Sequence, residues 1–149
     1  MTADNLESTS ALVGIRFPDG EYTITVAAND RLCRLVEAPP LPAGVAHPVW
    51  GHLATHVGKG VTFSEFAGLV GAPLDAGFLY GGGSLDFRES IRLDRRYLVR
   101  GGITSVVSHV GRRTGPFDVI TTELDLAEPE SEQWISRSCE SYIVPRRRG

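Results

Sequence analysis

The alternation of hydrophobic and polar residues predicts a β-rich domain. Residues 20–27 alternate, with Tyr22, Ile24 and Val26 on one face, as in a half-buried strand. Further extended or alternating segments occupy the second half of the chain, at residues 78–91, 97–110, 117–126 and 134–144. Because short polar turns separate these later segments, we expect consecutive antiparallel strands in a meander.

Helical patterns lie between the first strand and the later ones. A helix over residues 48–57 starts at Pro48, which the first turn tolerates, and has four apolar residues at helical spacing: Val49, Trp50, Leu53 and Val57. Shorter helices are expected after Asn29, as an N-cap, and after Thr62, whose spacing to Glu65 forms a capping box. An antiparallel sheet curved around one central helix is typical of the α+β hotdog fold.

Length and composition suit one domain. The chain has 149 residues, 42% of them hydrophobic, and a net charge of −3, which argues against nucleic-acid binding. No apolar run is long enough for a bilayer, and the first ten residues lack the features of a signal peptide. Two distant cysteines, Cys33 and Cys139, fit a reducing compartment. We expect a disordered arm over 1–12, one domain over 13–145, a basic tail over 146–149, and a cytoplasmic location.

Three of the four histidines fall within ten residues. His52 and His56 have the outer spacing of a zinc-protease helix, but Leu53 stands where the catalytic glutamate is needed. No third ligand lies nearby in sequence. We therefore expect no metal, and two histidines that bond to backbone or water on the flank of a packed helix.

Two other segments have alternative interpretations. Glycines 81–83 precede no phosphate-binding helix and predict a bend or bulge in a strand, with Asp86 and Arg88 solvated beyond it. Arginines 146–148 are expected to form a solvated tail. The alternative is contact with coenzyme A phosphates or an acidic carrier protein.

Several segments together resemble the MaoC-like dehydratases, including the related N-terminal domains of bacterial fatty-acid-synthase-type dehydratases. The similar segments are residues 85–106, 117–124 and 135–144, and His47-Pro-Val-Trp50, which resembles the start of that family's central helix. The resemblance implies a hotdog domain that binds an acyl thioester of coenzyme A or acyl carrier protein, without a cofactor. It also implies a homodimer, or a heteromer with a second hotdog subunit, because the family's substrate tunnel lies at the subunit junction.

The same resemblance locates a catalytic motif, Asp-x-Asn-Pro-x-His, and shows that this chain departs from it. Glu37 takes the Asp position, but Pro39 and Pro42 replace the Asn and the His. The remaining catalytic candidates are Glu37 and His47. The implied substrate contacts are His47, Val49, Trp50, Gly82 and Gly83.

Hydration of an enoyl thioester needs one group to activate water and another to protonate carbon, and proline provides neither. We therefore expect the isolated chain to bind medium or long acyl thioesters and to hydrate crotonyl-type substrates slowly or not at all. It is then the non-catalytic subunit beside a partner with an intact motif. The alternatives are a thioesterase that uses Glu37 or Glu65 with His47, and a non-enzymatic acyl-ligand-binding protein.

Overall fold

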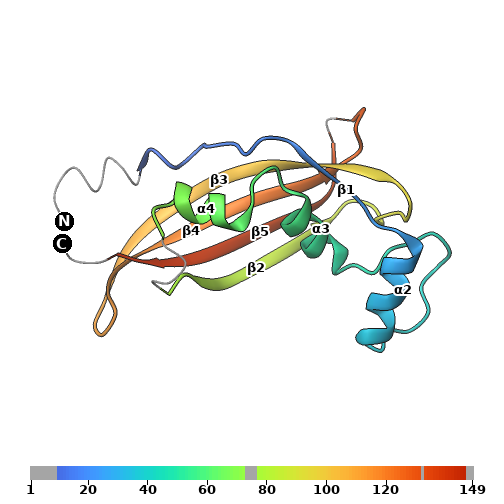
Figure 1. Ribbon diagram of the computed structural model, residues 1–149, viewed down its shortest axis with the longest axis horizontal. Coiled ribbons are helices and arrows are strands. Elements are labelled where there is room, and N and C mark those ends of the chain that lie inside the picture. The colour runs from blue at the N-terminus through green and yellow to red at the C-terminus, as the bar shows by residue number, and fades with distance from the viewer. Residues whose placement is uncertain (1–9, 73–76, 132, 147–149) are drawn as a thin grey trace.

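The protein folds into a five-stranded antiparallel sheet with helices on one face (Figure 1). A computed structural model describes residues 10–72, 77–131 and 133–146. In chain order the elements are β1 (Gly20–Thr23), α2 (Val26–Leu35), α3 (Trp50–Gly58), α4 (Phe63–Leu69), β2 (Leu79–Phe87), β3 (Arg96–Gly111), β4 (Gly115–Ala127) and β5 (Trp134–Pro145). The helices α3 and α4 lie over the middle of the sheet, and α2 lies at one end.

The first strand is shorter than predicted, because a helix begins within the predicted range. Thr25 caps α2, and its hydroxyl accepts a hydrogen bond of 3.2 Å from the amide of Ala28. The prediction of Asn29 as the cap is therefore wrong, and Asn29 lies buried inside the helix. The other four strands agree with their predicted segments, except that β2 ends at Phe87, before residue 91.

The predicted meander holds only for β3, β4 and β5. The spatial order is β1-β3-β4-β5-β2, so β2 pairs with β5 at the far edge and not with β3. The connection over residues 88–95 crosses the end of the sheet and places Ile91 in the core. Its middle is held by a β-bridge between Val45 and Arg92. A crossing of this kind has no periodic signal in the sequence.

Helix α3 packs on the sheet through a different face from the predicted one. Its buried residues are Trp50, Gly51, Ala54 and Thr55, whereas Val57 is exposed and Leu53 is only partly buried. Small residues allow the helix backbone to approach the strands closely. A Cβ at Gly51 would lie 3.2 Å from the Phe87 ring.

Three local predictions are confirmed. Thr62 and Glu65 form the capping box of α4, with bonds of 3.1 and 2.6 Å. The glycines in β2 coincide with a register shift between Tyr80 and Gly82. Residues 86 and 88 are exposed, as expected.

The ends of the domain differ from the prediction. Arg146 is not part of a solvated tail, because its Nε donates to Asp118 at 2.7 Å and its Nη1 donates to the Val70 carbonyl at 2.8 Å. Leu12 packs against the core, within the range predicted as a disordered arm. Residues 1–9 and 147–149 lie outside the described residues. Among the described residues, no helix is both long and apolar enough to cross a membrane.

Candidate functional site

The inner face of β5 is unusually polar for a covered strand. Ser136, Ser138, Glu140 and Tyr142 alternate along it and are all at most 3% exposed. The residues between them, Arg137, Cys139 and Ser141, are only partly buried. A buried carboxylate such as Glu140 is unfavourable unless its surroundings compensate its charge and its lone pairs.

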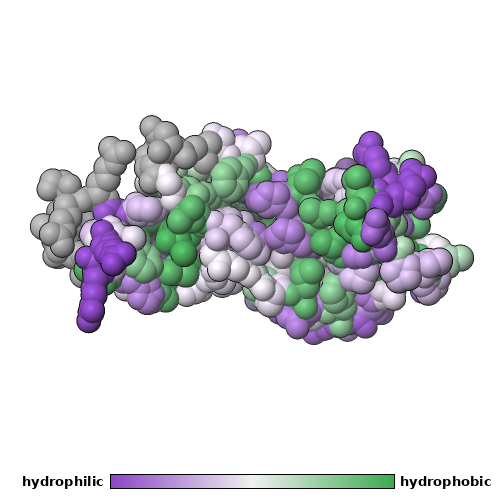
Figure 2. Space-filling view, turned by 90° about the horizontal axis from the view of Figure 1, so that it is seen from below, coloured by the Kyte–Doolittle hydropathy of each residue, from purple (hydrophilic) through white to green (hydrophobic). Residues whose placement is uncertain are grey.

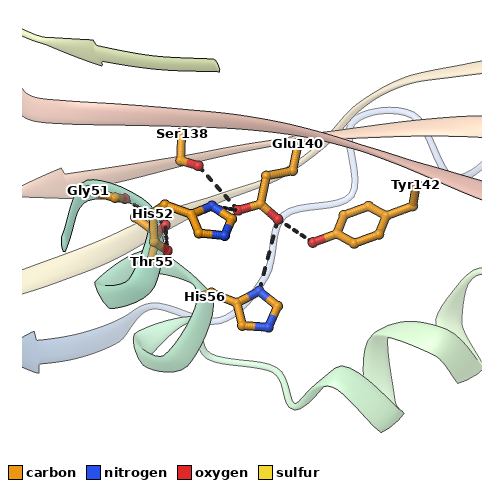
Figure 3. A network of polar contacts seen from close by, with 7 residues as sticks. All are labelled: Gly51, His52, Thr55, His56, Ser138, Glu140 and Tyr142. Carbon is orange, nitrogen blue, oxygen red and sulfur yellow. Dashed lines mark hydrogen bonds and ion pairs between the residues drawn. The ribbon is translucent and has the colours of Figure 1, made fainter. Parts of the chain in front are cut away.

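Side chains from two elements, α3 and β5, provide this compensation for Glu140 (Figure 3). One carboxylate oxygen lies 2.8 Å from Nδ1 of His52 and accepts a 3.2 Å hydrogen bond from Ser138. The other accepts a hydrogen bond from the Tyr142 hydroxyl and lies 4.0 Å from Nδ1 of His56. We call these five residues the Glu140 cluster.

Helix α3 places both histidines over the carboxylate. Residues four apart lie on the same face of a helix, and the rings of His52 and His56 stack with centroids 6.0 Å apart and 20° between their planes. Thr55, between them on the buried side, is satisfied within the helix, because its hydroxyl donates to the carbonyls of Gly51 and His52 at 2.9 Å. The side chains of His52 and His56 are 32% and 40% exposed, whereas Glu140 beneath them is 1% exposed.

The electrostatics of the cluster favour a neutral His56. Partial burial lowers the pKa of His56, and the nearby Lys59 cation lowers it further, against the opposing effect of Glu140. Burial also lowers the pKa of Lys59, whose side chain lies over the Phe66 ring. Burial and its bond to Glu140 raise the pKa of Tyr142 well above its usual range, so this phenol remains a hydrogen-bond donor.

The environment predicted for these histidines is therefore wrong. They face a buried carboxylate from a strand more than eighty residues away in sequence, rather than backbone or water. Within the described part of the chain, no group of three His, Cys, Asp or Glu side chains is arranged to hold a metal ion.

The structure does not bring the predicted Glu37 and His47 into contact. Glu37 is exposed, with a φ of 53°, just after α2. His47 accepts a 3.1 Å hydrogen bond at Nδ1 from the amide of Val49, the N-cap residue of α3. Neither a hydrogen bond nor an ion pair joins the two side chains in the described structure.

His47 is instead positioned by Asn29, for which the sequence predicts the role of a helix cap. Asn29, 4% exposed, accepts hydrogen bonds at Oδ1 from the backbone N–H of His47 at 2.9 Å and from Nε1 of Trp50 at 3.1 Å. A buried amide with two such bonds fixes the segment that leads into α3. In the sequence, the only indication of this role of Asn29 is that it closely follows the first predicted strand.

The predicted substrate contacts fall into two groups. Gly83 pairs with Glu140 across the strands, and a Cβ there would lie 2.6 Å from the Tyr80 hydroxyl, so Gly83 borders the cluster. Gly82 is its neighbour in the bulge. Trp50 is buried against Tyr22, with ring centroids 6.0 Å apart, next to a half-buried Val49.

Aromatic rings border the histidines on the side of β2. The Phe63 ring centroid lies 6.3 Å from that of His56 and 5.1 Å from that of Phe78, and Tyr80 lies 6.1 Å from His52. Phe63 and Tyr80 are exposed. Figure 2 views the molecule from the side of the β2 edge and shows separate hydrophobic areas among paler ones. The accessible edge of the histidine pair therefore lies beside apolar surface.

Comparison with known proteins identifies the architecture. No protein-family model matches the sequence, and no curated protein matches it. Solved structures match over nearly the whole chain. The ChsH1-ChsH2 complex from Mycobacterium tuberculosis is 9% identical, with a TM-score of 0.72 over 99% of this chain and 94% of that one. The HadBC (3R-hydroxyacyl-ACP dehydratase) complex of the same organism is 12% identical, with a TM-score of 0.65 over 89% and 96%. A MaoC-like dehydratase from Rhodospirillum rubrum is 18% identical, with a TM-score of 0.55 over 92% and 94%.

The chain has the hotdog fold. This confirms the fold class predicted from the sequence. Thioesterases are also among the hotdog structures that match, such as the 1,4-dihydroxy-2-naphthoyl-CoA thioesterase from Synechocystis, at 17% identity and a TM-score of 0.55 over 87% of this chain and 81% of that one. The hotdog neighbours thus include both dehydratases and thioesterases. In this hotdog domain the Glu140 cluster lies between α3 and the strand next to the β2 edge.

Proposed function

We propose that this hotdog protein binds an acyl thioester, carried on coenzyme A or acyl carrier protein, as a hydratase or dehydratase homologue with a degenerate Asp/His motif. The observation that supports it best is the Glu140 cluster, a buried carboxylate under two accessible imidazoles, beside exposed aromatic rings. Polar groups that converge next to an apolar wall are typical of a small-molecule site.

The chemistry of the ligand fits both parts of this surface. An acyl chain is apolar and packs against Phe63, Phe78 and Tyr80, whereas a thioester carbonyl accepts hydrogen bonds of the kind that an imidazole N–H donates. His47, Val49, Trp50, Gly82 and Gly83 remain proposed substrate contacts. Of these, Gly83 lies nearest to Glu140.

The degenerate motif supports ligand binding without turnover by this chain alone. Glu37 and Pro42 are both exposed, and among the described residues no side chain forms a hydrogen bond with either of them. A second hotdog subunit with an intact motif would then provide turnover in a heteromer. One of the matching hotdog structures, the HadBC complex, is named as a 3R-hydroxyacyl-ACP dehydratase.

Binding is tested with the purified chain alone. Titration calorimetry with saturated acyl-CoA thioesters of graded chain length should give saturable binding that strengthens as the chain lengthens, with free coenzyme A as the control. Equal affinity for free coenzyme A and for all acyl lengths, or no binding at all, contradicts the proposal.

A thioesterase is the second candidate function. It is favoured by one observation, the His52 Nδ1 contact with Glu140 at 2.8 Å, because a carboxylate that holds an imidazole orients it to activate water. Release of free thiol from acyl-CoA, followed with a thiol reagent, distinguishes it. Sustained release that is lost in His52→Asn supports hydrolysis, and intact thioester after prolonged incubation excludes it.

A further inference from the structure

We propose that His52 and His56, bridged by Glu140, form the acid–base pair that adds water to a 2-enoyl thioester or removes it from a 3-hydroxyacyl thioester. The inference rests on the proposed thioester binding and goes beyond it, because it gives turnover to a chain whose Glu37 and Pro42 stand in a degenerate motif. It assigns catalysis to α3 and β5 instead of the loop before α3.

The geometry provides two imidazoles for one water molecule. Their nearly parallel rings have centroids 6.0 Å apart, close enough for one water molecule to contact both imidazoles. Each histidine directs Nδ1 toward Glu140. No hydrogen bond in the described structure engages either Nε2 atom. Both Nε2 atoms therefore remain available to a water and a substrate between the helix and the β2 edge.

The charges around the two histidines indicate which of them acts as the acid and which as the base. Glu140 is the acidic side chain in contact with both imidazoles, and its closer contact, at 2.8 Å, is with Nδ1 of His52. His56 is 4.0 Å away, and its buried Nδ1 has no hydrogen-bond partner. It faces Lys59, Glu140 and His52, and Lys59 opposes its protonation. His56 is thus the base and His52 the acid.

The step balances with water as the only co-reactant. The water oxygen bonds to the β-carbon of the enoyl thioester while its proton passes to Nε2 of neutral His56. The α-carbon takes a proton from Nε2 of the His52 imidazolium, and the carbon–carbon double bond becomes a single bond. The proton gained at Nε2 of His56 then leaves to solvent, and Nε2 of His52 takes up a proton from solvent, because both side chains are partly exposed. Dehydration is the reverse sequence.

Three other residues position this pair without touching the substrate. Ser138 and Tyr142 each donate to one carboxylate oxygen, and Tyr142 is only 3% exposed. They hold the carboxylate plane toward α3. Lys59 acts through its charge on His56.

The test measures binding and turnover on the same samples of the full chain. Hydration of crotonyl-CoA and of a longer 2-enoyl-CoA is followed by loss of enoyl absorbance, and saturated acyl-CoA binding by calorimetry. His52→Asn, His56→Asn and Glu140→Gln should each lower kcat by about 10²- to 10⁴-fold and change the dissociation constant by less than about threefold. His109→Asn is the matched control, because His109 is exposed and stacks on Phe117 in the distant hairpin.

A pH profile separates catalysis from loss of structure. The base acts when neutral, so hydration should fall as the pH drops through the lowered pKa of His56. Lys59→Gln removes a cation that lowers this pKa, so it should move the acidic limb to higher pH. Tyr142→Phe keeps the ring and should lower kcat with little change in thermal stability.

The outcomes distinguish the inference from the function on which it rests. Binding without hydration by the unmodified chain overturns the acid–base pair and leaves a binding subunit. Hydration that is lost in Glu37→Gln or His47→Ala, but kept in the His52 and His56 variants, overturns it as well. Absence of thioester binding overturns the proposed function itself. An unchanged pH profile in Lys59→Gln contradicts the assignment of His56 as the base.

Discussion

Asn29 joins three parts of the molecule through one amide oxygen. It lies in α2, and its Oδ1 accepts hydrogen bonds from the backbone of His47 and the indole of Trp50. Asn29→Ala leaves two buried donors without an acceptor, so we expect the free energy of unfolding to fall by about 1–3 kcal/mol. Urea denaturation measures it, with Asp30→Ala as the exposed control on the same helix. Equal stability of the two variants would contradict this role for the amide.

The ionisation of His56 provides a second test at the residue scale. Its pKa lies below the usual 6.5 because of burial and Lys59, with Glu140 acting in the opposite direction. Lys59→Gln should therefore raise this pKa, and Glu140→Gln should lower it further. Titration of the histidine ring signals by NMR measures both shifts, with the exposed His109 as an internal reference. A shift of the same sign in both variants would show that another group controls His56.

Residues of the site were harder to predict than the elements that hold them. Along 134–144 the sequence predicts a strand, and a glutamate in such a strand is ordinarily expected on the exposed face. The structure instead buries Glu140, together with Ser136, Ser138 and Tyr142. This burial depends on the histidines that α3 places opposite the carboxylate, and a contact between residues 52 and 140 has no local signature. Glu37 was predicted as catalytic from its place in a motif, but it is exposed to solvent. A place in a motif does not show which distant residues will surround a side chain.

At the scale of elements, the strands and helices were predicted well because each depends on local alternation or capping. The capping box of Thr62 and Glu65 fixed the start of α4, and Thr25 displaced Asn29 as the cap of α2 through an equally local bond. The order of the strands was predicted correctly only for β3, β4 and β5. The place of β2 depends on the crossing segment that leads from it to β3, and pairing of β2 with the distant β5 leaves no pattern along the sequence.

Alanine substitutions at two glycines near α4 are expected to have opposite effects on the stability of the fold. A Cβ at Gly60 would lie 1.9 Å from the Pro18 carbonyl oxygen, where backbone meets backbone, so Gly60→Ala should destabilise the fold by about 3 kcal/mol. Gly68 lies in α4 with nothing within 4 Å of the added Cβ. Gly68→Ala should stabilise the protein by about 0.5–1 kcal/mol, because alanine loses less backbone entropy in a helix. Thermal unfolding of both variants checks the contrast, and a destabilised Gly68→Ala would refute it.

At the scale of the whole molecule, β2 forms an edge of the sheet with exposed apolar side chains, including Leu79, Tyr80 and Phe87. An unprotected edge of this kind favours pairing with another chain. We therefore expect a homodimer, or a heteromer with a second hotdog subunit, that covers β2. Leu79→Lys should raise the dissociation constant at least about tenfold, because a charge on an edge strand opposes pairing.

Analytical ultracentrifugation of the chain alone measures this equilibrium. Val110→Lys is the matched control, because Val110 is similarly exposed but lies at the far hairpin between β3 and β4. A monomer at all concentrations, for both the unmodified chain and its mixture with a hotdog partner, would rule out the edge as an interface. Equal weakening by both substitutions would place the contact elsewhere.

The position of β5 between β4 and β2 also determines the stage of folding at which the Glu140 cluster forms (Figure 1). Residues Leu79 and Ile143 are register partners, so β2 leaves the ribosome long before the strand that pairs with it. The α3 segment with its two histidines is likewise synthesised long before Glu140. Closing such distant contacts is slow compared with forming a helix. During refolding, recovery of the site should therefore lag behind the helical signal, and the Glu140 contacts report completion of the sheet rather than its beginning.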